Sequence, residues 1–434
     1  MNMLEKIFKL SEHPETDLKT EAIAGLTTFF TMAYVLATIP GMLDVGGLDR
    51  GATLTAMIFL IIVTSFAMGV FTNKPFVLAP GLGSVAIVAG MIGNENIEPE
   101  IAAGVIFISG VIFVLISFIG LREAVVKAIP VSLKQAVSAG IGIFIALIGA
   151  KGAGIIVATE VKNSLTFGQL NTAPVILAVI GFAIILILKS LKIKGYLILS
   201  ILATTIIGIP MGLTTLPDSF MSLPSSMGSR FLAIDIPAAF SVSYIPFVIA
   251  LFIPDFFSTF GTVLGVGTQA GYLDEDGNLP GIDKCFQVDA VATVTGSFFG
   301  MPSMTTYLES SAGVESGGRT GLTTIFTGIC FVLALFFSPI ALMIPKAATS
   351  PALIFIGINM MNSLRLIDYD DFTEAFPAFM CIAFTIFGNN IANGICVAIP
   401  VYVLLKLANG RSKEIQPLMY LLVIVCCLYF YTLI

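Results

Sequence analysis

The sequence predicts an all-α protein that crosses a membrane many times. Of its 434 residues, 57% are hydrophobic and only 11% are charged, and the mean hydropathy is +1.00. Soluble domains carry about 25% charged residues, so this chain has too little polar surface for a water-soluble fold of its size. Apolar stretches of the length that a helix needs to cross a bilayer recur along the whole chain.

Composition also argues against several function classes. No basic run interleaved with aromatic residues is present, so we expect no nucleic-acid partner. The single histidine, His13, lies in the N-terminal tail, and the six cysteines lie mostly inside apolar runs without metal-ligand spacing. We therefore expect no metal, no cofactor and no enzyme active site, since no nucleophile–base pair is apparent.

Fourteen spans are predicted, two of them interrupted. They are Thr20–Ile39, Gly51–Phe71, Pro75–Ile92 (interrupted), Ile101–Ile119, Val131–Ile148, Thr172–Leu188, Gly195–Met211, Ile245–Val266, Asp289–Gly300, Ser303–Val314 (interrupted), Gly321–Ile344, Pro351–Leu364, Phe376–Phe387 and Ile391–Leu407. A last apolar run, Pro417–Ile434, forms either an extra span or a helix along the membrane surface.

The distribution of basic residues predicts the orientation. If the N-terminus is cytoplasmic, most of the 21 Lys and Arg fall on cytoplasmic segments. Those that do not are Arg50, Lys151, Lys162, Arg230 and Lys346. The positive-inside rule therefore favours a multi-pass protein of the cell (plasma) membrane with a cytoplasmic N-terminus.

The order of the spans predicts two halves. Residues 1–211 form a first seven-span repeat, residues 212–244 a connecting segment, and residues 245–434 a second repeat followed by the C-terminal apolar segment. An odd number of spans per half makes the second repeat insert upside down. Short similarities between the halves agree with this. TFFT at 28–31 resembles DFFS at 255–258, an offset of 227 residues. The interrupted segment LAPGLGS at 78–84 lies 230 residues before LESSAGV at 308–314.

Glycine and proline interrupt one span in each half. The interrupting residues are Pro75, Pro80, Gly81 and Gly83 in the first half, and Gly300, Pro302, Gly313, Gly317 and Gly318 in the second. Proline removes a backbone donor from a helix, and half-helices that begin at such breaks present free N–H groups. Paired interruptions of this kind predict a binding site near the membrane midplane, and the alternative is a pair of kinked helices.

Two carboxylates, Asp255 and Glu309, lie deepest in the predicted spans. A charge at that depth costs roughly 2.5 to 3.5 kcal/mol unless it faces a cavity or a partner, and no Lys or Arg is predicted at comparable depth. An ionised carboxylate only accepts hydrogen bonds, so the pair suits a flat ligand edged with N–H groups. Because burial penalises the charged form, either acid is also a candidate carrier of a coupling proton.

Other charged groups receive structural interpretations. Glu315 and Arg319 stand at i and i+4, a spacing typical of an ion pair, or they cap a helix end. The acidic stretches Asp274–Asn278 and Asp368–Asp371 are predicted to be solvated loops.

Several motifs resemble the nucleobase–cation symporters of the nucleobase–ascorbate transporter superfamily. These are EAIAGLTTFFTMAYVL from Glu21, PFVLAPGLG from Pro75, PDFFSTFGT from Pro254 and TTYLESSAGVESGGRTGLT from Thr305. The similarity runs from Glu21 to about Gln416, and it is strongest to the azaguanine-type branch of hypoxanthine/guanine/adenine permeases.

The resemblance implies fourteen helices in two inverted repeats, a core domain that moves against a gate domain, and frequent homodimers. It implies that spans 3 and 10 cross through extended pieces at Val77–Ser84 and Ser303–Tyr307. The substrate-binding residues that it implies are Asp255, Glu309, Gly83, Ser84, Thr28, Thr31 and Thr259. Two positions depart from the purine branch, since Ser258 replaces a second Asp and Val85 replaces an Asn.

We therefore expect a secondary active transporter for purine nucleobases such as hypoxanthine, guanine or adenine. The expected mechanism is H⁺ symport by alternating access, in which Glu309 and Asp255 couple the proton and Na⁺ is the alternative cation. Four alternatives remain: an anion transporter of the sulfate/bicarbonate type, a uracil or xanthine permease, a channel and a membrane enzyme. The expected partners are a small-molecule nucleobase, a cation, the lipid bilayer and a second copy of the chain.

Overall fold

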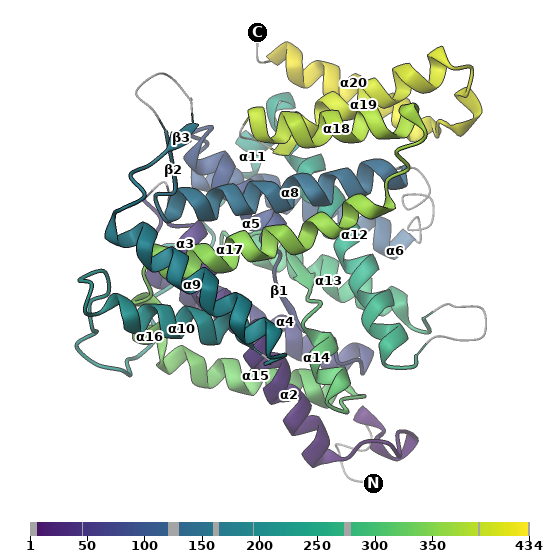
Figure 1. Cartoon of the computed structure of the whole chain (residues 1–434). Coiled ribbons are helices and arrows are strands. Elements are labelled where there is room, and N and C mark those ends of the chain that lie inside the picture. The colour runs from purple at the N-terminus through teal and green to yellow at the C-terminus, as the bar shows by residue number, and fades with distance from the viewer. Residues whose placement is uncertain are drawn as a thin grey trace.

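The computed structural model describes residues 7–45, 47–119, 130–158, 165–193, 195–272, 279–388 and 391–432. Within these ranges the regular structure is helical apart from two pairs of three-residue strands (Figure 1). Six described helices are long and apolar enough to cross a membrane, and further apolar helices are shorter. The predicted loop 274–278 and Lys162 lie outside the described residues.

The first half follows the predicted order of spans. Its elements are α2 (Leu18–Met32), α3 (Val35–Met42), α4 (Arg50–Thr72), β1 (Leu78–Pro80), α5 (Leu82–Gly93), α6 (Pro99–Ile119), α8 (Val131–Gly152), β2 (Ile156–Ala158), β3 (Leu165–Phe167), α9 (Ala173–Ser190) and α10 (Tyr196–Gly208). Asp17 and Asp49 cap the starts of α2 and α4 by accepting backbone N–H groups.

The second half repeats this pattern of helices around a second short strand. Its elements are α11 (Ile236–Ala239), α12 (Ile245–Gln269), α13 (Ile282–Ser297), β4 (Met304–Thr306), α14 (Ser310–Glu315), α15 (Gly321–Phe336), α16 (Ser338–Leu342), α17 (Lys346–Met360), α18 (Phe372–Phe387), α19 (Ile391–Ala408) and α20 (Pro417–Thr432). Short 3₁₀ turns lie between some of them.

Two details correct the predicted boundaries. The first span is divided at Ala33 and Tyr34 into α2 and α3. Helix α13 begins at Ile282 rather than at Asp289, because exposed Asp283 and Lys284 lower the hydropathy of its first turn, while Cys285 and Phe286 are buried. Asp289 therefore lies in the middle of a helix.

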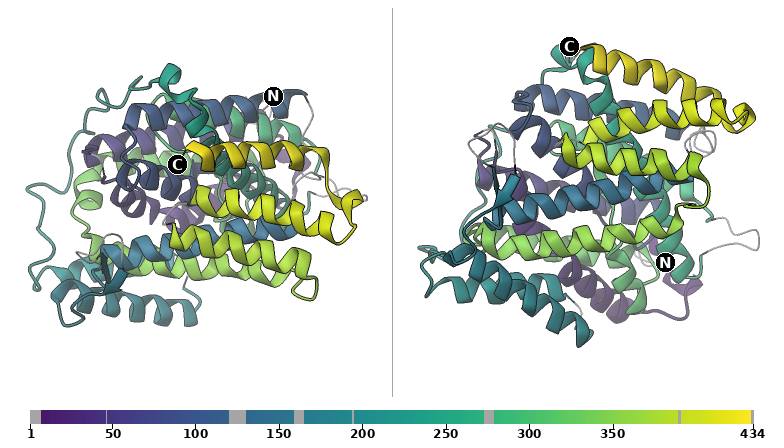
Figure 2. Two further views of the ribbon diagram at one scale, coloured as in Figure 1. Left: turned by 90° about the horizontal axis from the view of Figure 1, so that it is seen from above. Right: turned by 45° about the horizontal axis from the view of Figure 1, so that its top comes forward.

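The helices form two packed groups. One group contains α2, α4, α6, α12, α13 and α15, and the other contains α8, α9, α10, α17, α18 and α19. Figures 1 and 2 show α8, α17 and α18 side by side, with α19 and α20 beyond them. We call the first group the core and the second the gate, in agreement with the division that the resemblance implies. Helix α20 packs on α19 and α12.

Candidate functional site

The candidate site is built around the pairing of β1 with β4 inside the core. The strands are antiparallel, and Leu78, Ala79 and Pro80 lie opposite Thr306, Thr305 and Met304. Two backbone hydrogen bonds of 2.9 Å extend the pairing, from Gly81 N to Ser303 O and from Tyr307 N to Val77 O. The predicted extended piece Ser303–Tyr307 is thus confirmed. The piece Val77–Ser84 is shorter than predicted, because α5 starts directly after the extended Gly81.

Side chains satisfy the backbone groups that this irregular segment leaves free. The Tyr307 hydroxyl donates to Pro80 O over 2.6 Å, and Val77 N donates to the Ser310 hydroxyl over 3.0 Å. Leu78 N donates to the hydroxyl of Ser65 on α4 over 3.2 Å. Non-helical backbone at membrane depth requires such internal partners, so these side chains explain why the crossing is stable.

Glu309 lies just after β4, at the start of α14. Its side chain is partly exposed, and its Oε1 accepts a 2.7 Å hydrogen bond from the hydroxyl of buried Tyr34, at the turn between α2 and α3. No ion pair to Glu309 occurs among the described residues. This carboxylate therefore has one fixed donor and keeps acceptor capacity for a ligand.

Asp255 lies on α12 and is only 3% exposed. Its Oδ2 accepts a hydrogen bond of 3.3 Å from Thr293 of α13, and the hydroxyls of Ser303 and Thr305 lie beside the carboxyl group. Among the described residues its Oδ1 has no hydrogen-bond partner. The Asp255 carboxyl is therefore buried against the crossing.

Asp289, which the sequence analysis did not single out, is fully buried next to Asp255. The Thr259 hydroxyl donates to its Oδ2 over 2.9 Å, and the Thr306 hydroxyl donates to its Oδ1 over 3.4 Å. The hydroxyls of Thr259 and Thr305 are also 2.9 Å apart. The spacing of Cys285, Asp289 and Thr293 at four-residue steps was the available signal, since it places all three on one face of a helix.

The other predicted residues divide into two sets. Thr259 joins the carboxyl pair to the crossing. Gly83 lies in the first turn of α5, where an added Cβ would be 3.2 Å from Ile141 of α8, so it lies between core and gate. Ser84, in the same turn, is buried.

Thr28 and Thr31 donate their hydroxyls to carbonyl groups of their own helix α2. A Cβ on Gly313 would be 2.2 Å from the Thr28 hydroxyl, so Thr28 packs tightly against α14. Thr28 thus lies next to the half-helix that follows Glu309.

Arg319 caps the end of α14, and no hydrogen bond joins it to Glu315 among the described contacts. The Arg319 guanidinium donates to the carbonyls of Val314 and Gly318, each over 2.8 Å. Glu315 accepts from the side chain of Gln269 on α12 over 3.0 Å. Of the two interpretations of this pair, the cap is confirmed for Arg319.

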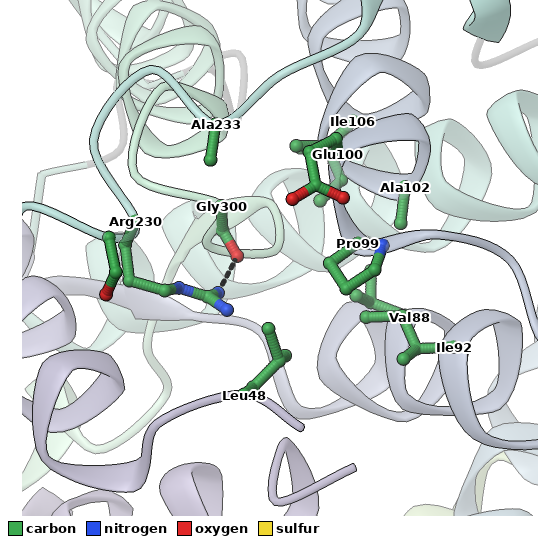
Figure 3. Close-up of a pocket in the computed structure, with 12 residues that line it drawn as sticks. Leu48, Val88, Ile92, Pro99, Glu100, Ala102, Ile106, Arg230, Ala233 and Gly300 are labelled. Carbon is green, nitrogen blue, oxygen red and sulfur yellow. Dashed lines mark hydrogen bonds between the residues drawn. The ribbon is translucent and has the colours of Figure 1, made fainter. Parts of the chain in front are cut away.

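A separate hollow lies beside the turn before β4 (Figure 3). Arg230 of the connecting segment and Glu100 of α6 line it together with apolar side chains such as Leu48 and Ile106. The Arg230 guanidinium donates to Gly300 O over 2.5 Å. This contact fixes the connecting segment to the turn before β4.

Comparison with protein families decides what kind of protein carries this site. The model of a permease family matches residues 19–397. The chain belongs to this permease family. It is therefore a multi-pass membrane transporter and not an enzyme, and the resemblance seen in the motifs is confirmed.

Curated relatives match the permease over nearly its whole length. The adenine permease AdeP of Escherichia coli K12 is 36% identical, over 96% of this chain and 93% of the relative. The guanine/hypoxanthine permease PbuO of Bacillus subtilis is 37% identical, over 95% and 96%.

Solved structures share the fold at low sequence identity. The transmembrane domain of the cyanobacterial bicarbonate transporter BicA matches with a TM-score of 0.63 and 15% identity, over 88% of this chain and 97% of that chain. SLC26A9 matches with a TM-score of 0.62 and 13% identity, over 94% and 68%. The helical transporter fold predicted from the sequence is thereby confirmed.

Proposed function

We propose that this permease takes up purine nucleobases. The observation that carries the proposal is the Glu309 carboxylate, which is partly exposed beside the crossing and is oriented by Tyr34. Among the described residues it has no ion pair with a Lys or Arg. A purine presents N–H groups along its ring edge, and a carboxylate accepts two such donors. The relatives named adenine and guanine/hypoxanthine permeases support the same substrate class.

The remaining predicted site residues receive supporting roles in this proposal. The first turn of α5, with Gly83 and Ser84, faces the gate and completes the pocket through its backbone N–H groups. Thr28 and Thr31 form the wall behind α14, while Asp255 and Thr259 support the crossing from inside the core. Substrate would then bind between a core that carries the carboxylates and a gate that closes over it.

Uptake is proposed to be coupled to H⁺ and to proceed by alternating access of core against gate. Two inverted repeats, residues 1–211 and 245–434, supply equivalent halves for such a motion. The distribution of basic residues supports a cytoplasmic N-terminus in the plasma membrane. Dimerisation is proposed only on the family resemblance.

An anion substrate is the second candidate, because a bicarbonate transporter shares the fold. Fold alone does not determine the substrate. Carboxylates at Asp255, Asp289 and Glu309 oppose an anion whenever they are ionised, since like charges repel strongly at low dielectric constant. The site therefore favours a hydrogen-bond donor over an anion.

The first test measures thermal stabilisation of the purified permease by hypoxanthine, guanine, adenine, uracil, xanthine and sulfate. A ligand at 100 times its Kd stabilises the native state by about 2.7 kcal/mol. We expect purines to raise the Tm of the wild type and of Glu315→Gln, which changes a carboxylate on the same short helix, but not of Glu309→Gln. Stabilisation by sulfate alone, or an undiminished response of Glu309→Gln, would contradict the proposal.

A further inference from the structure

We propose that Asp255 and Asp289 hold a single proton between them, that this proton rests on Asp255, and that this pair is the site of the coupled proton. Glu309 then binds the base without carrying the proton. The inference rests on the proposed function and narrows it, because it separates the substrate-binding carboxylate from the coupling carboxyl groups.

The first argument is electrostatic. Asp255 is 3% exposed and Asp289 is fully buried, and no Lys or Arg forms an ion pair with either of them among the described residues. Two carboxylates that share a buried site cannot both stay ionised without a large cost. One proton on the pair removes that cost, and the two groups then titrate as a unit.

Hydrogen-bond partners favour Asp289 as the charged member of the pair. With Asp289 ionised, the Thr259 hydroxyl donates its one proton to Asp289, and its oxygen then accepts from Thr305. Thr306 donates to the other oxygen of Asp289. Donors thus converge on Asp289, and hydrogen bonds to a carboxylate favour its ionised form.

Asp255 is less firmly hydrogen-bonded. The Thr293 hydroxyl donates to it over a long 3.3 Å and is also 3.0 Å from Met304 O, and the Thr305 hydroxyl lies beside the carboxyl group. Its Oδ1 and the fully buried hydroxyl oxygen of Ser303 have no partner within hydrogen-bonding distance among the described residues. Ser303 nevertheless lies beside the Asp255 carboxyl. A proton on Oδ1 of Asp255 makes this atom a hydrogen-bond donor, and a small movement directs it to the Ser303 hydroxyl. This one hydrogen bond then satisfies two buried groups.

Few other titratable groups act on the pair. Cys285 lies one turn before Asp289 on α13 and is buried. Lys74, from the segment after α4, interacts electrostatically with Cys285. The neighbouring groups of α12, α13 and the crossing are the hydroxyls of Ser303 and the threonines named above. For Asp289, the charge of the Asp255 carboxyl is the electrostatic contribution that adds to burial.

The crossing connects this pair to the substrate site. Thr305 belongs to β4, and Glu309 follows it by four residues in the same segment. Gly81 on the opposite strand packs against Thr305, where an added Cβ would be 2.8 Å from its methyl group. A displacement of the crossing when a base binds Glu309 therefore changes the donors to Asp289, and with them the affinity of the pair for its proton.

The test uses purified protein in proteoliposomes and the base that stabilises it best. Counterflow exchange of this base needs no net proton movement, whereas accumulation driven by a pH gradient does. We expect Asp289→Asn to keep counterflow and to lose gradient-driven accumulation. Asp283→Asn, which changes an exposed carboxylate on the same helix, should retain both.

Thr305→Val provides a second measurement that does not remove a carboxyl group. It deletes the donor to Thr259 at nearly constant volume, so the anionic form of Asp289 loses support. The pair then holds its proton more tightly, and the pH dependence of accumulation should move about one unit upward. Thr295→Val is the matched control, because the Thr295 hydroxyl donates within its own helix. This variant should leave the pH dependence of accumulation unchanged.

Three results would overturn the inference. These are full gradient-driven accumulation by Asp289→Asn, an unchanged pH profile in Thr305→Val, and accumulation by the wild type that follows a Na⁺ gradient instead of a pH gradient. Absence of counterflow for every base in the wild type would instead refute the proposed function, and the pair's role with it. Counterflow in the variants shows that they are folded.

Discussion

At the scale of single residues, the site contains carboxyl groups in two different surroundings. Glu309 is partly exposed and has one donor, the Tyr34 hydroxyl. Asp255 and Asp289 are buried and accept hydrogen bonds from the hydroxyl groups of Thr293, Thr259 and Thr306. A carboxyl group can thus accept hydrogen bonds from a ligand at one position and hold a proton at another, because solvent access and neighbouring donors differ.

Tyr34→Phe tests the role of the donor to Glu309. The variant removes a 2.7 Å hydrogen bond to a carboxylate while it keeps the aromatic ring. Hydrogen bonds to charged groups contribute about 1.5 to 3 kcal/mol, so we expect base affinity to fall about tenfold or more, as measured by calorimetric titration. Tyr402→Phe in the gate, whose hydroxyl lies 3.4 Å from Glu374, serves as the control. Equal affinities in both variants would show that Tyr34 does not orient Glu309.

At the scale of elements, small residues allow the core helices to approach closely. Gly321 begins α15 against Gly69 of α4, and an added Cβ there would be 2.0 Å from the Gly69 carbonyl oxygen. Glu21 of α2 accepts the backbone N–H groups of Arg319 and Thr320 at the start of the same helix. These contacts fix α2, α4 and α15 to each other next to the segment that carries Glu309, as is typical of small residues between membrane helices.

Gly321→Ala is expected to destabilise the core. The new methyl group meets backbone atoms, which cannot rotate away, so the helices must separate at a cost of about 1 to 3 kcal/mol. A lower Tm of the purified variant checks this expectation. Gly41→Ala is the matched control, because nothing lies within 4 Å of an added Cβ at that helical position. If both variants melt at the wild-type temperature, the contact does not limit the approach of the helices.

At the scale of the whole molecule, an ionic cluster ties the gate together. Lys406 of α19 is fully buried and lies 2.7 Å from Glu374 of α18 and 2.8 Å from Glu414. Glu374 also accepts a hydrogen bond from Ser132 of α8. Because a buried charge without a partner is costly, the cluster holds three gate helices in one arrangement, as a gate that moves as a unit requires.

The cluster predicts a pH dependence of stability. Hydrogen bonds from Thr373 and then from Arg411 hold the pKa of Asp371, at the start of α18, well below its usual value of 3.8. A lowered pKa in the folded state stabilises the protein above the unfolded value, and this contribution is lost as the pH falls through the folded value. We expect the difference in Tm between wild type and Asp371→Asn to shrink below about pH 4. The exposed neighbour Asp370 provides the control Asp370→Asn, whose Tm should follow the wild type throughout.

Local chemistry along the chain accounts for the class of fold and for the positions of its breaks. Long apolar runs define membrane helices because no other structure satisfies the backbone in lipid. Pro80 and Gly81 end regular structure locally, whatever surrounds them. The strand Met304–Thr306, the half-helix after Glu309 and the buried Asp255 all follow from such local chemistry.

Only the tertiary structure decided which polar groups meet. Asp289 looked like the end of a span, because hydropathy registers side chains and not their neighbours, yet α13 buries it against Thr259 and Thr306. Likewise, Lys406 was assigned to a cytoplasmic helix end and is fully enclosed by acids from other elements. The partner of a buried charge comes from a helix distant in sequence, so its identity depends on how the helices pack.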